Sequence, residues 1–130
     1  MNPIDGGKIT TAFGVKGKMW TSGQHEGVDI ACKDGTPVHA MTDGVVRGVG
    51  IWGKAFGIFS PVIKHGQSYV VYAHLSRVAV KTGQRVKRGQ VIGYSGHNGN
   101  ATGPHLHVEE QAHITWTAGG GLNPQHLLDA

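Results

Sequence analysis

A histidine and an aspartate lie four residues apart in the segment His25-Glu26-Gly27-Val28-Asp29. In an extended strand, residues of equal parity point to the same face, so His25, Gly27 and Asp29 would share one face. Gly27 has no side chain and leaves space between the two potential ligands. Imidazole nitrogens and carboxylate oxygens both bind zinc. The segment therefore predicts a place for a metal ion, although this spacing alone arises often by chance.

Two more histidines alternate along the segment Gly103-Pro104-His105-Leu106-His107-Val108-Glu109. Strand parity puts His105 and His107 on one face and directs Leu106 and Val108 towards a core. Two protonated imidazoles side by side would repel each other, so a metal or a catalytic role explains the pair. The alternative interpretation is two exposed histidines on the surface of a strand.

A further histidine lies in the segment Tyr72-Ala73-His74-Leu75, at the end of the apolar strand Tyr69–His74, where strand parity would put Tyr72 and His74 on one face. A lone histidine at a strand end is usually structural, so it gains weight only beside the others. Together the three segments supply four histidines and one aspartate. A catalytic zinc site needs three protein ligands and an open position for water. Two further histidines could then transfer protons and stabilise the developing oxyanion.

These segments resemble those of the lysostaphin/LytM-type zinc endopeptidases, which hydrolyse bacterial peptidoglycan. The segments occur in the order in which that family has them, and the resemblance covers Gly7 to Glu109, most of the chain. It includes three spacers: Asp34-Gly35-Thr36-Pro37-Val38, Asp43-Gly44-Val45-Val46 and Val86-Lys87-Arg88-Gly89-Gln90-Val91-Ile92-Gly93. The resemblance implies one zinc ion per chain, an antiparallel β-sheet with a substrate groove, and cleavage of a stem-peptide or cross-bridge bond in the wall.

The resemblance also implies roles for particular residues. Zinc would be bound by His25, Asp29 and His107, and His74 and His105 would be the two catalytic histidines. Zinc acidifies its bound water and polarises the scissile carbonyl. Either catalytic histidine could take the water proton, and we favour His105 because it lies one strand step from His107.

Two glutamates and two loops flank these residues. Glu26 is expected to point away from the site. Glu109 shares the face of the histidines, where it either orients one of them or forms a surface salt bridge. The segments Ser22-Gly23-Gln24 and 97–101 depart from the family pattern and are expected to border the groove, which leaves substrate preference open. A phage lysin and an excised domain of a secreted autolysin both fit.

The elements that position these residues are expected to be strands. Helical periodicity is nearly absent, and Gly or Pro interrupts almost every window long enough for a helix. We predict an all-β fold, mainly an antiparallel sheet, forming a single zinc peptidase domain over residues 1–130 with at most a helical turn after Asn123-Pro124. Strands are predicted at Lys8–Phe13, Val28–Ala31, Val38–Ala40, Gly44–Val49, Phe59–Lys64, Tyr69–His74, Val91–Ser95 and His105–Gln111.

Composition narrows the classes of partner. The net charge of +4 favours an anionic partner such as the cell wall. The densest basic group, Lys81, Arg85, Lys87 and Arg88, has no interleaved aromatic residues, so we expect no nucleic acid and interpret it as a solvated face. The single cysteine, Cys32, excludes an intramolecular disulfide.

No apolar run approaches the length of a membrane span, and the N-terminus lacks the apolar region of a signal peptide. We therefore expect no membrane insertion, action on the cell wall by an export route that the sequence leaves open, and a monomer. Three other classes remain as alternatives: a non-catalytic wall-binding or activator domain of the same fold, a lipoyl- or biotin-carrier-like module, and a metal-storage domain. The carrier lacks support because no lysine lies on a suitable hairpin.

Overall fold

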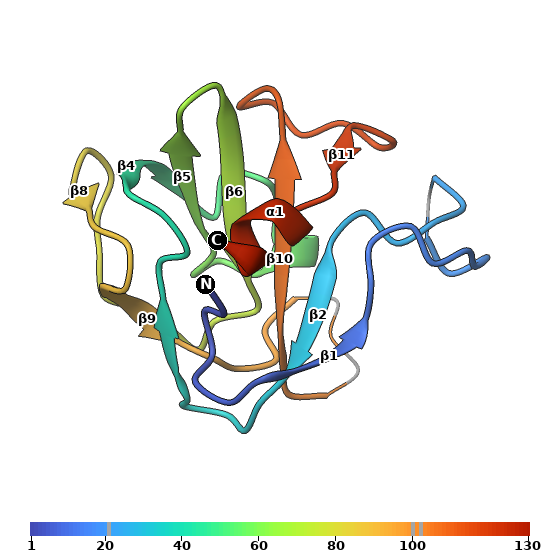
Figure 1. The fold of residues 1–130 in the computed structure, drawn as a ribbon, viewed down its shortest axis with the longest axis horizontal. Helices are drawn as coiled ribbons and strands as arrows, with labels where there is room; N and C mark the ends of the chain where they lie inside the picture. The colour runs from blue at the N-terminus through green and yellow to red at the C-terminus, as the bar shows by residue number, and fades with distance from the viewer. Residues whose placement is uncertain (21, 100, 102) are drawn as a thin grey trace.

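The computed structural model describes residues 1–20, 22–99, 101 and 103–130. These residues form antiparallel strands with one short α-helix, so the all-β prediction is confirmed (Figure 1). The larger sheet contains β1 (Lys8–Thr11), β2 (Val28–Ala31), β4 (Gly44–Val49), β5 (Pro61–His65), β6 (Ser68–Ala73), β8 (Arg85–Val86), β10 (His105–Gln111) and β11 (Gly121–Leu122). The smaller sheet contains β3 (Pro37–His39), β7 (Arg77–Val78) and β9 (Val91–Tyr94).

The order of strands in the larger sheet brings distant segments together. The order is β1-β2-β10-β6-β5-β4-β8, with β11 paired to β10, and the smaller sheet runs β3-β9-β7. Figure 1 shows β10 lying between β2 and β6. The first and last of the histidine segments are therefore neighbours in space, although about eighty residues separate them in the chain.

The larger sheet has a hydrophobic cluster on each face. The main core lies on one face, where Ile30, Val70, Tyr72 and Leu106 are fully buried. A smaller cluster covers part of the other face and contains Trp52, Phe56, Val62, Val71 and Ala73. The small residues of this second cluster are cross-strand partners of His107 and Glu109, so the second cluster lies beside the histidines of β10.

The predicted strands are all present, with boundaries that differ by two residues at most. Three two-residue strands, β7, β8 and β11, and a 3-10 helix at Lys54–Phe56 were not predicted. The helix α1 (Gln125–Asp129) starts after Asn123-Pro124 as expected, and the Asn123 side chain accepts a hydrogen bond from the Gln125 backbone N–H. None of the described helices has the length and apolar character that a membrane span requires.

Candidate metal and catalytic site

The antiparallel pairing of β2 with β10 brings together the aspartate and one of the histidines. Asp29 and His107 lie directly opposite each other in the register, so their side chains leave the same face of the sheet. Oδ1 of Asp29 is 2.7 Å from Nδ1 of His107. The sequence prediction that these residues share a site thus corresponds to a direct contact.

His25 reaches the same place from outside the strand, since β2 begins only at Val28. Backbone hydrogen bonds to Gly14 and Val15 hold its main chain. Its ring Nδ1 lies 3.1 Å from the carbonyl oxygen of Ala12. A carbonyl oxygen can only accept, so Nδ1 carries the hydrogen and Nε2 keeps its lone pair. That Nε2 lies 3.3 Å from Oδ1 of Asp29.

The three donor atoms are close enough to hold one metal ion. One ligand atom each from His25, Asp29 and His107 lies within 4.8 Å of the others. Bonds of about 2.0–2.2 Å in a tetrahedral zinc site place ligand atoms roughly 3.3–3.6 Å apart. The 3.3 Å spacing between His25 and Asp29 fits this value. The shorter contact between Asp29 and His107 is a hydrogen bond that a metal ion would replace.

Gly27 makes room for the ring of His107. A Cβ at this position would lie 2.3 Å from the carbonyl oxygen of Val108 and 2.8 Å from Nε2 of His107. The sequence suggested that the absent side chain leaves space between ligands. The structure shows that the imidazole of His107 and the backbone of β10 fill that space.

The other two predicted histidines face each other at the edge of the same site. The ring centres of His74 and His105 are 4.9 Å apart, and Nε2 of His105 is 3.7 Å from Oδ1 of Asp29. Nδ1 of His105 lies 2.9 Å from the Gly103 carbonyl, and Nδ1 of His74 lies 2.5 Å from the Asn98 carbonyl. Both rings therefore carry hydrogen on Nδ1 and keep an unprotonated Nε2 when neutral.

His74 has an unusual backbone, and the face assigned to it from strand parity was wrong. Its φ of 67° is the only positive value at a non-glycine residue among those described. β6 ends at Ala73, and Tyr72 is buried in the main core on the opposite face. The left-handed residue turns the imidazole back towards His105, and a hydrogen bond from its N–H to the Phe56 carbonyl holds it there.

Glu109 is buried behind His107 and accepts three hydrogen bonds. Its Oε1 lies 3.0 Å from Nε2 of His107, and its Oε2 accepts from Nε2 of Gln111 at 3.0 Å and from the indole N–H of Trp116. Only 2% of Glu109 is exposed, which rules out the surface salt bridge considered from the sequence. Glu26 points away as expected, and its Oε1 accepts the Gly121 backbone N–H.

Burial and hydrogen bonding shift the pKa values of Asp29, His107 and His74. Burial works to raise the pKa of Asp29, but the hydrogen bond from His107 and the adjacent imidazole of His25 outweigh it and hold that pKa far below its usual range. Burial works to lower the pKa of His107, but the hydrogen bonds to Asp29 and Glu109 raise it to about 9. Burial lowers the pKa of His74 to about 4, against its hydrogen bond to Asn98.

These shifts describe a site that attracts positive charge. At neutral pH and without metal, His107 is protonated between two carboxylates, while His74 is neutral. A divalent cation in place of that proton would meet the Nδ1 lone pair of His107, with Nε2 still tied to Glu109. The donor set of two imidazoles and one carboxylate therefore fits a zinc ion.

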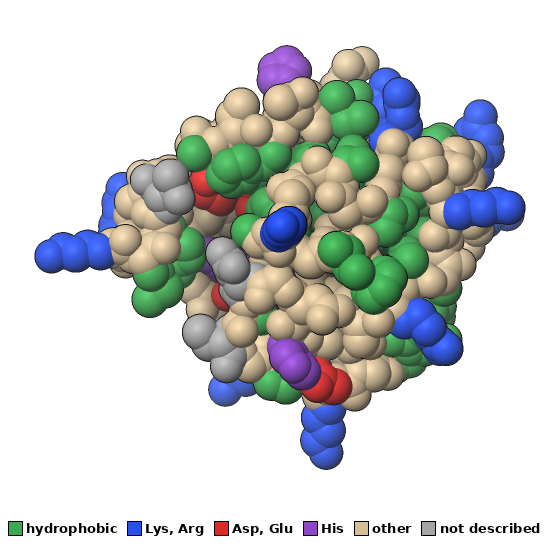
Figure 2. Space-filling model, turned by 180° about the vertical axis from the view of Figure 1, so that it is seen from behind, with side chains coloured by type: hydrophobic (Ala, Val, Ile, Leu, Met, Phe, Trp, Pro, Cys, Tyr) green, Lys and Arg blue, Asp and Glu red, His purple; other side chains and the backbone are tan. Residues whose placement is uncertain are grey.

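Aromatic rings surround the ligands. The ring of Trp20 is centred 5.0 Å from His25, and that of Phe56 lies 6.0 Å from His107 and 5.9 Å from Trp116. Trp52 packs in the second core and Trp116 packs against it, while Trp20 lies beside His25. Acidic and histidine side chains are visible in a recess on the face that Figure 2 shows.

Sequence reasoning missed the groups that hold the histidine rings. The carbonyls of Ala12 and Asn98 and the indole of Trp116 carry no motif of their own, because any residue supplies a carbonyl. Asn98 belongs to the segment 97–101 that was expected to border the groove, and Asn100 in that segment lies outside the described residues. The remaining histidines lie elsewhere, namely His39, His65, His97, His113 and His126.

Comparison with known proteins gives a consistent result. Residues 23–119 match Peptidase family M23. Over 86 residues the chain is 49% identical to the peptidoglycan DD-endopeptidase ShyA of Vibrio cholerae, an alignment that covers 65% of this chain and 20% of ShyA. The chain thus spans about a fifth of the length of that curated relative.

Two solved structures share the fold. The catalytic domain of the antimicrobial peptidase lysostaphin from Staphylococcus simulans has a TM-score of 0.85 at 30% identity, over 97% of this chain and 95% of that one. A zinc-containing peptidase from Vibrio cholerae has a TM-score of 0.75 at 35% identity, over 94% of this chain and 37% of the other. The resemblance inferred from the histidine segments is confirmed, and the chain belongs to Peptidase family M23.

Proposed function

We propose that this chain is a zinc-dependent endopeptidase that hydrolyses peptide bonds of bacterial peptidoglycan. The observation that supports this most is the convergence of five side chains from three separate segments. Three of them offer metal-binding atoms within 4.8 Å, and two more present Nε2 atoms at the edge of the same site. The 49% identity to ShyA, a peptidoglycan DD-endopeptidase, favours peptidoglycan as the substrate.

In this proposal, zinc would be held by Nε2 of His25, a carboxylate oxygen of Asp29 and Nδ1 of His107. When bound, zinc supplies a Lewis acid that activates water and polarises the amide carbonyl. Glu109 accepts the Nε2 hydrogen of His107, which fixes the ring so that Nδ1 faces the metal. The ring of His107 is thereby oriented without a metal.

His105 and His74 would perform the proton transfers. Nε2 of His105 would take a proton from the attacking water and pass it to the leaving amine. His105 is our choice because its Nε2 lies 3.7 Å from Oδ1 of Asp29, whereas the ring of His74 lies against the rings of His105 and His107. His74, neutral because burial lowers its pKa, would present an unprotonated Nε2 that can accept a hydrogen bond from the substrate or the attacking water.

The test is digestion of purified peptidoglycan. Zinc-loaded protein should release new amino termini that mass spectrometry can assign to one bond type, if walls of several cross-link chemistries are compared. An Asp29→Ala variant should release none. Binding to the walls without new termini in the zinc-loaded protein would instead identify a non-catalytic wall-binding domain, and would refute the proposed activity.

A further inference from the structure

Three cationic residues project from one end of the larger sheet, on the same face as the histidines. Lys64 of β5 lies opposite Val45 of β4, and Val45 lies opposite Arg85 of β8. Cross-strand partners share a face, so Lys64 and Arg85 flank Val45 on the two sides. An irregularity in the β4–β5 pairing falls at Arg47, which is exposed two residues further along β4.

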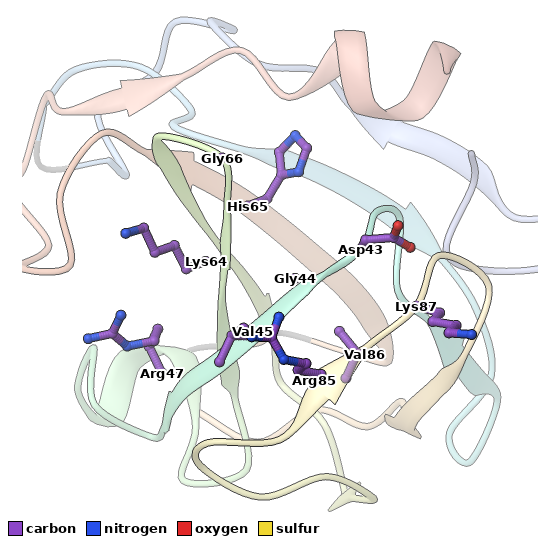
Figure 3. A pocket seen from close by; sticks show the side chains of 10 residues that line it. All are labelled: Asp43, Gly44, Val45, Arg47, Lys64, His65, Gly66, Arg85, Val86 and Lys87. Carbon is purple, nitrogen blue, oxygen red and sulfur yellow. The ribbon is translucent and has the colours of Figure 1, made fainter.

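These side chains surround an open hollow of about 680 Å³. Figure 3 shows Lys64 on one side of β4 and Arg85 and Lys87 on the other. The floor is formed by Val45 and Gly44. Gly44 brings the backbones close, because a Cβ there would lie 2.4 Å from the Lys64 carbonyl oxygen. The hollow is therefore lined by cations above an apolar and backbone surface.

The cations of the hollow have no acidic partners. Within the part of the chain that the structure describes, every ion pair involves a histidine, and no lysine or arginine side chain lies within 4.0 Å of an Asp or Glu carboxylate oxygen. Asp43 is the one acidic residue in the lining, and its Oδ1 accepts the backbone N–H of Arg88 at 2.7 Å. The hollow therefore keeps a net positive charge, because Arg47, Lys64, Arg85 and Lys87 outnumber the single carboxylate of Asp43.

We propose that this hollow is a binding site for a phosphodiester chain, such as a polyol-phosphate polymer of the cell wall. Arginine guanidinium groups make paired hydrogen bonds to phosphate oxygens, and lysine adds a point charge. The cations stand on three neighbouring strands and in a row, which suits a linear polymer with repeated charges better than a single small anion. From the sequence, the net charge favoured an anionic wall, and Arg85 and Lys87 were interpreted as part of a solvated face.

The hollow lies on the same face of the larger sheet as the candidate metal site. The register continues as one row from Gln111 of β10 through Tyr69 of β6 to Lys64 and Arg85. β4 lies three strand steps from β10, or about 14 Å at roughly 4.8 Å per step. A polymer attached to the wall could thus be held beside the site without entering it. The binding site does not depend on the proposed peptidase activity.

The experiment is a titration of the zinc-loaded protein with a synthetic poly(glycerol phosphate) oligomer at several salt concentrations. Poly-L-glutamate of equal charge is the comparison probe. The test variant is Arg47→Gln/Arg85→Gln. A matched control, Lys8→Gln/Lys33→Gln, removes the same charge from exposed residues outside the hollow. Hydrolysis of a short uncharged peptide reports whether each variant keeps its fold.

Wild type and the control should bind the phosphate polymer equally and more tightly than they bind poly-L-glutamate. In the test variant, the slope of log affinity against log salt should fall by about 1.4–1.8, the loss of two phosphate contacts. Equal weakening in both variants would show a mere effect of net charge, and equal binding of both polymers would exclude phosphate recognition. Either result overturns the proposal. Phosphate binding without peptide hydrolysis would overturn only the proposed peptidase function.

Discussion

Replacing Glu109 by glutamine should weaken zinc binding while leaving the sheet in place. The amide has nearly the same shape, and its oxygen could still accept the Nε2 hydrogen of His107. Its NH₂ group would then face the indole N–H of Trp116 and the amide of Gln111, which now donate to Oε2. Two N–H donors would then face a third donor without an acceptor between them. His107 would also lose the carboxylate that makes its ring more basic.

The expected size follows from these contacts. Loss of a carboxylate behind a metal-binding histidine typically lowers metal affinity about 10–100-fold. This corresponds to roughly 1.4–2.8 kcal/mol of binding free energy. Leaving a buried donor unsatisfied costs about 1–3 kcal/mol of stability, so the Tm of the variant should also fall. At saturating zinc most activity should return, because Glu109 positions a ligand and does not contact substrate.

The assay is competition for zinc with a chromophoric chelator, together with thermal unfolding of the metal-free protein. Glu110→Gln is the matched control, since Glu110 is also buried and accepts hydrogen bonds from Ser68 and His126 on the other face of β10. The control should lose stability but keep its zinc affinity. Unchanged zinc affinity in Glu109→Gln, or an equal loss in the control, would refute the role given to Glu109.

Three further predictions concern the site. His74→Ala and His105→Ala should keep one zinc per chain by elemental analysis but lose about 10²–10⁴-fold in peptide hydrolysis, and a variant that loses its metal would prove to be missing a ligand. Gly27→Ala should unfold at lower denaturant concentration than Gly103→Ala, because only the first Cβ meets a backbone carbonyl at 2.3 Å, whereas Gly103 has open space; equal midpoints would contradict this. The raised pKa of His107 stabilises the metal-free fold below about pH 6.5, and this stabilisation should disappear as the pH rises through about 9; the lowered pKa of His74 stabilises it above about pH 6.5 and is lost as the pH falls through about 4. Unfolding free energies measured from pH 4 to 10 should therefore peak near neutrality, and a monotonic curve would argue against these two shifts.

The features predicted best from the sequence are strands in which polar and apolar residues alternate. Along β10, alternating polar and apolar residues placed His105, His107 and Glu109 on one face, because one side of the strand is buried in the main core. The two-residue strands β7 and β8 were missed because a pattern of alternation needs more residues than they contain.

Strand parity does not apply where the backbone leaves the strand. His25 precedes β2 and is held by bonds to residues 12–15, and His74 turns through a positive φ after β6 ends. Neither the position of His25 nor that of His74 can be predicted from residue types, since both depend on where distant backbone groups are fixed. The same holds for the contact of Trp116 with Glu109, which depends on the path of the chain after β10.

The most direct test of the account is the position of zinc in crystals of the metal-loaded protein. Data collected on either side of the zinc absorption edge locate the ion independently of any assumption about its ligands. The account predicts one anomalous peak per chain, about 2.0–2.2 Å from Nε2 of His25, a carboxylate oxygen of Asp29 and Nδ1 of His107. A peak bound by His74 or His105, or by Nε2 of His107 after displacement of Glu109, would contradict it.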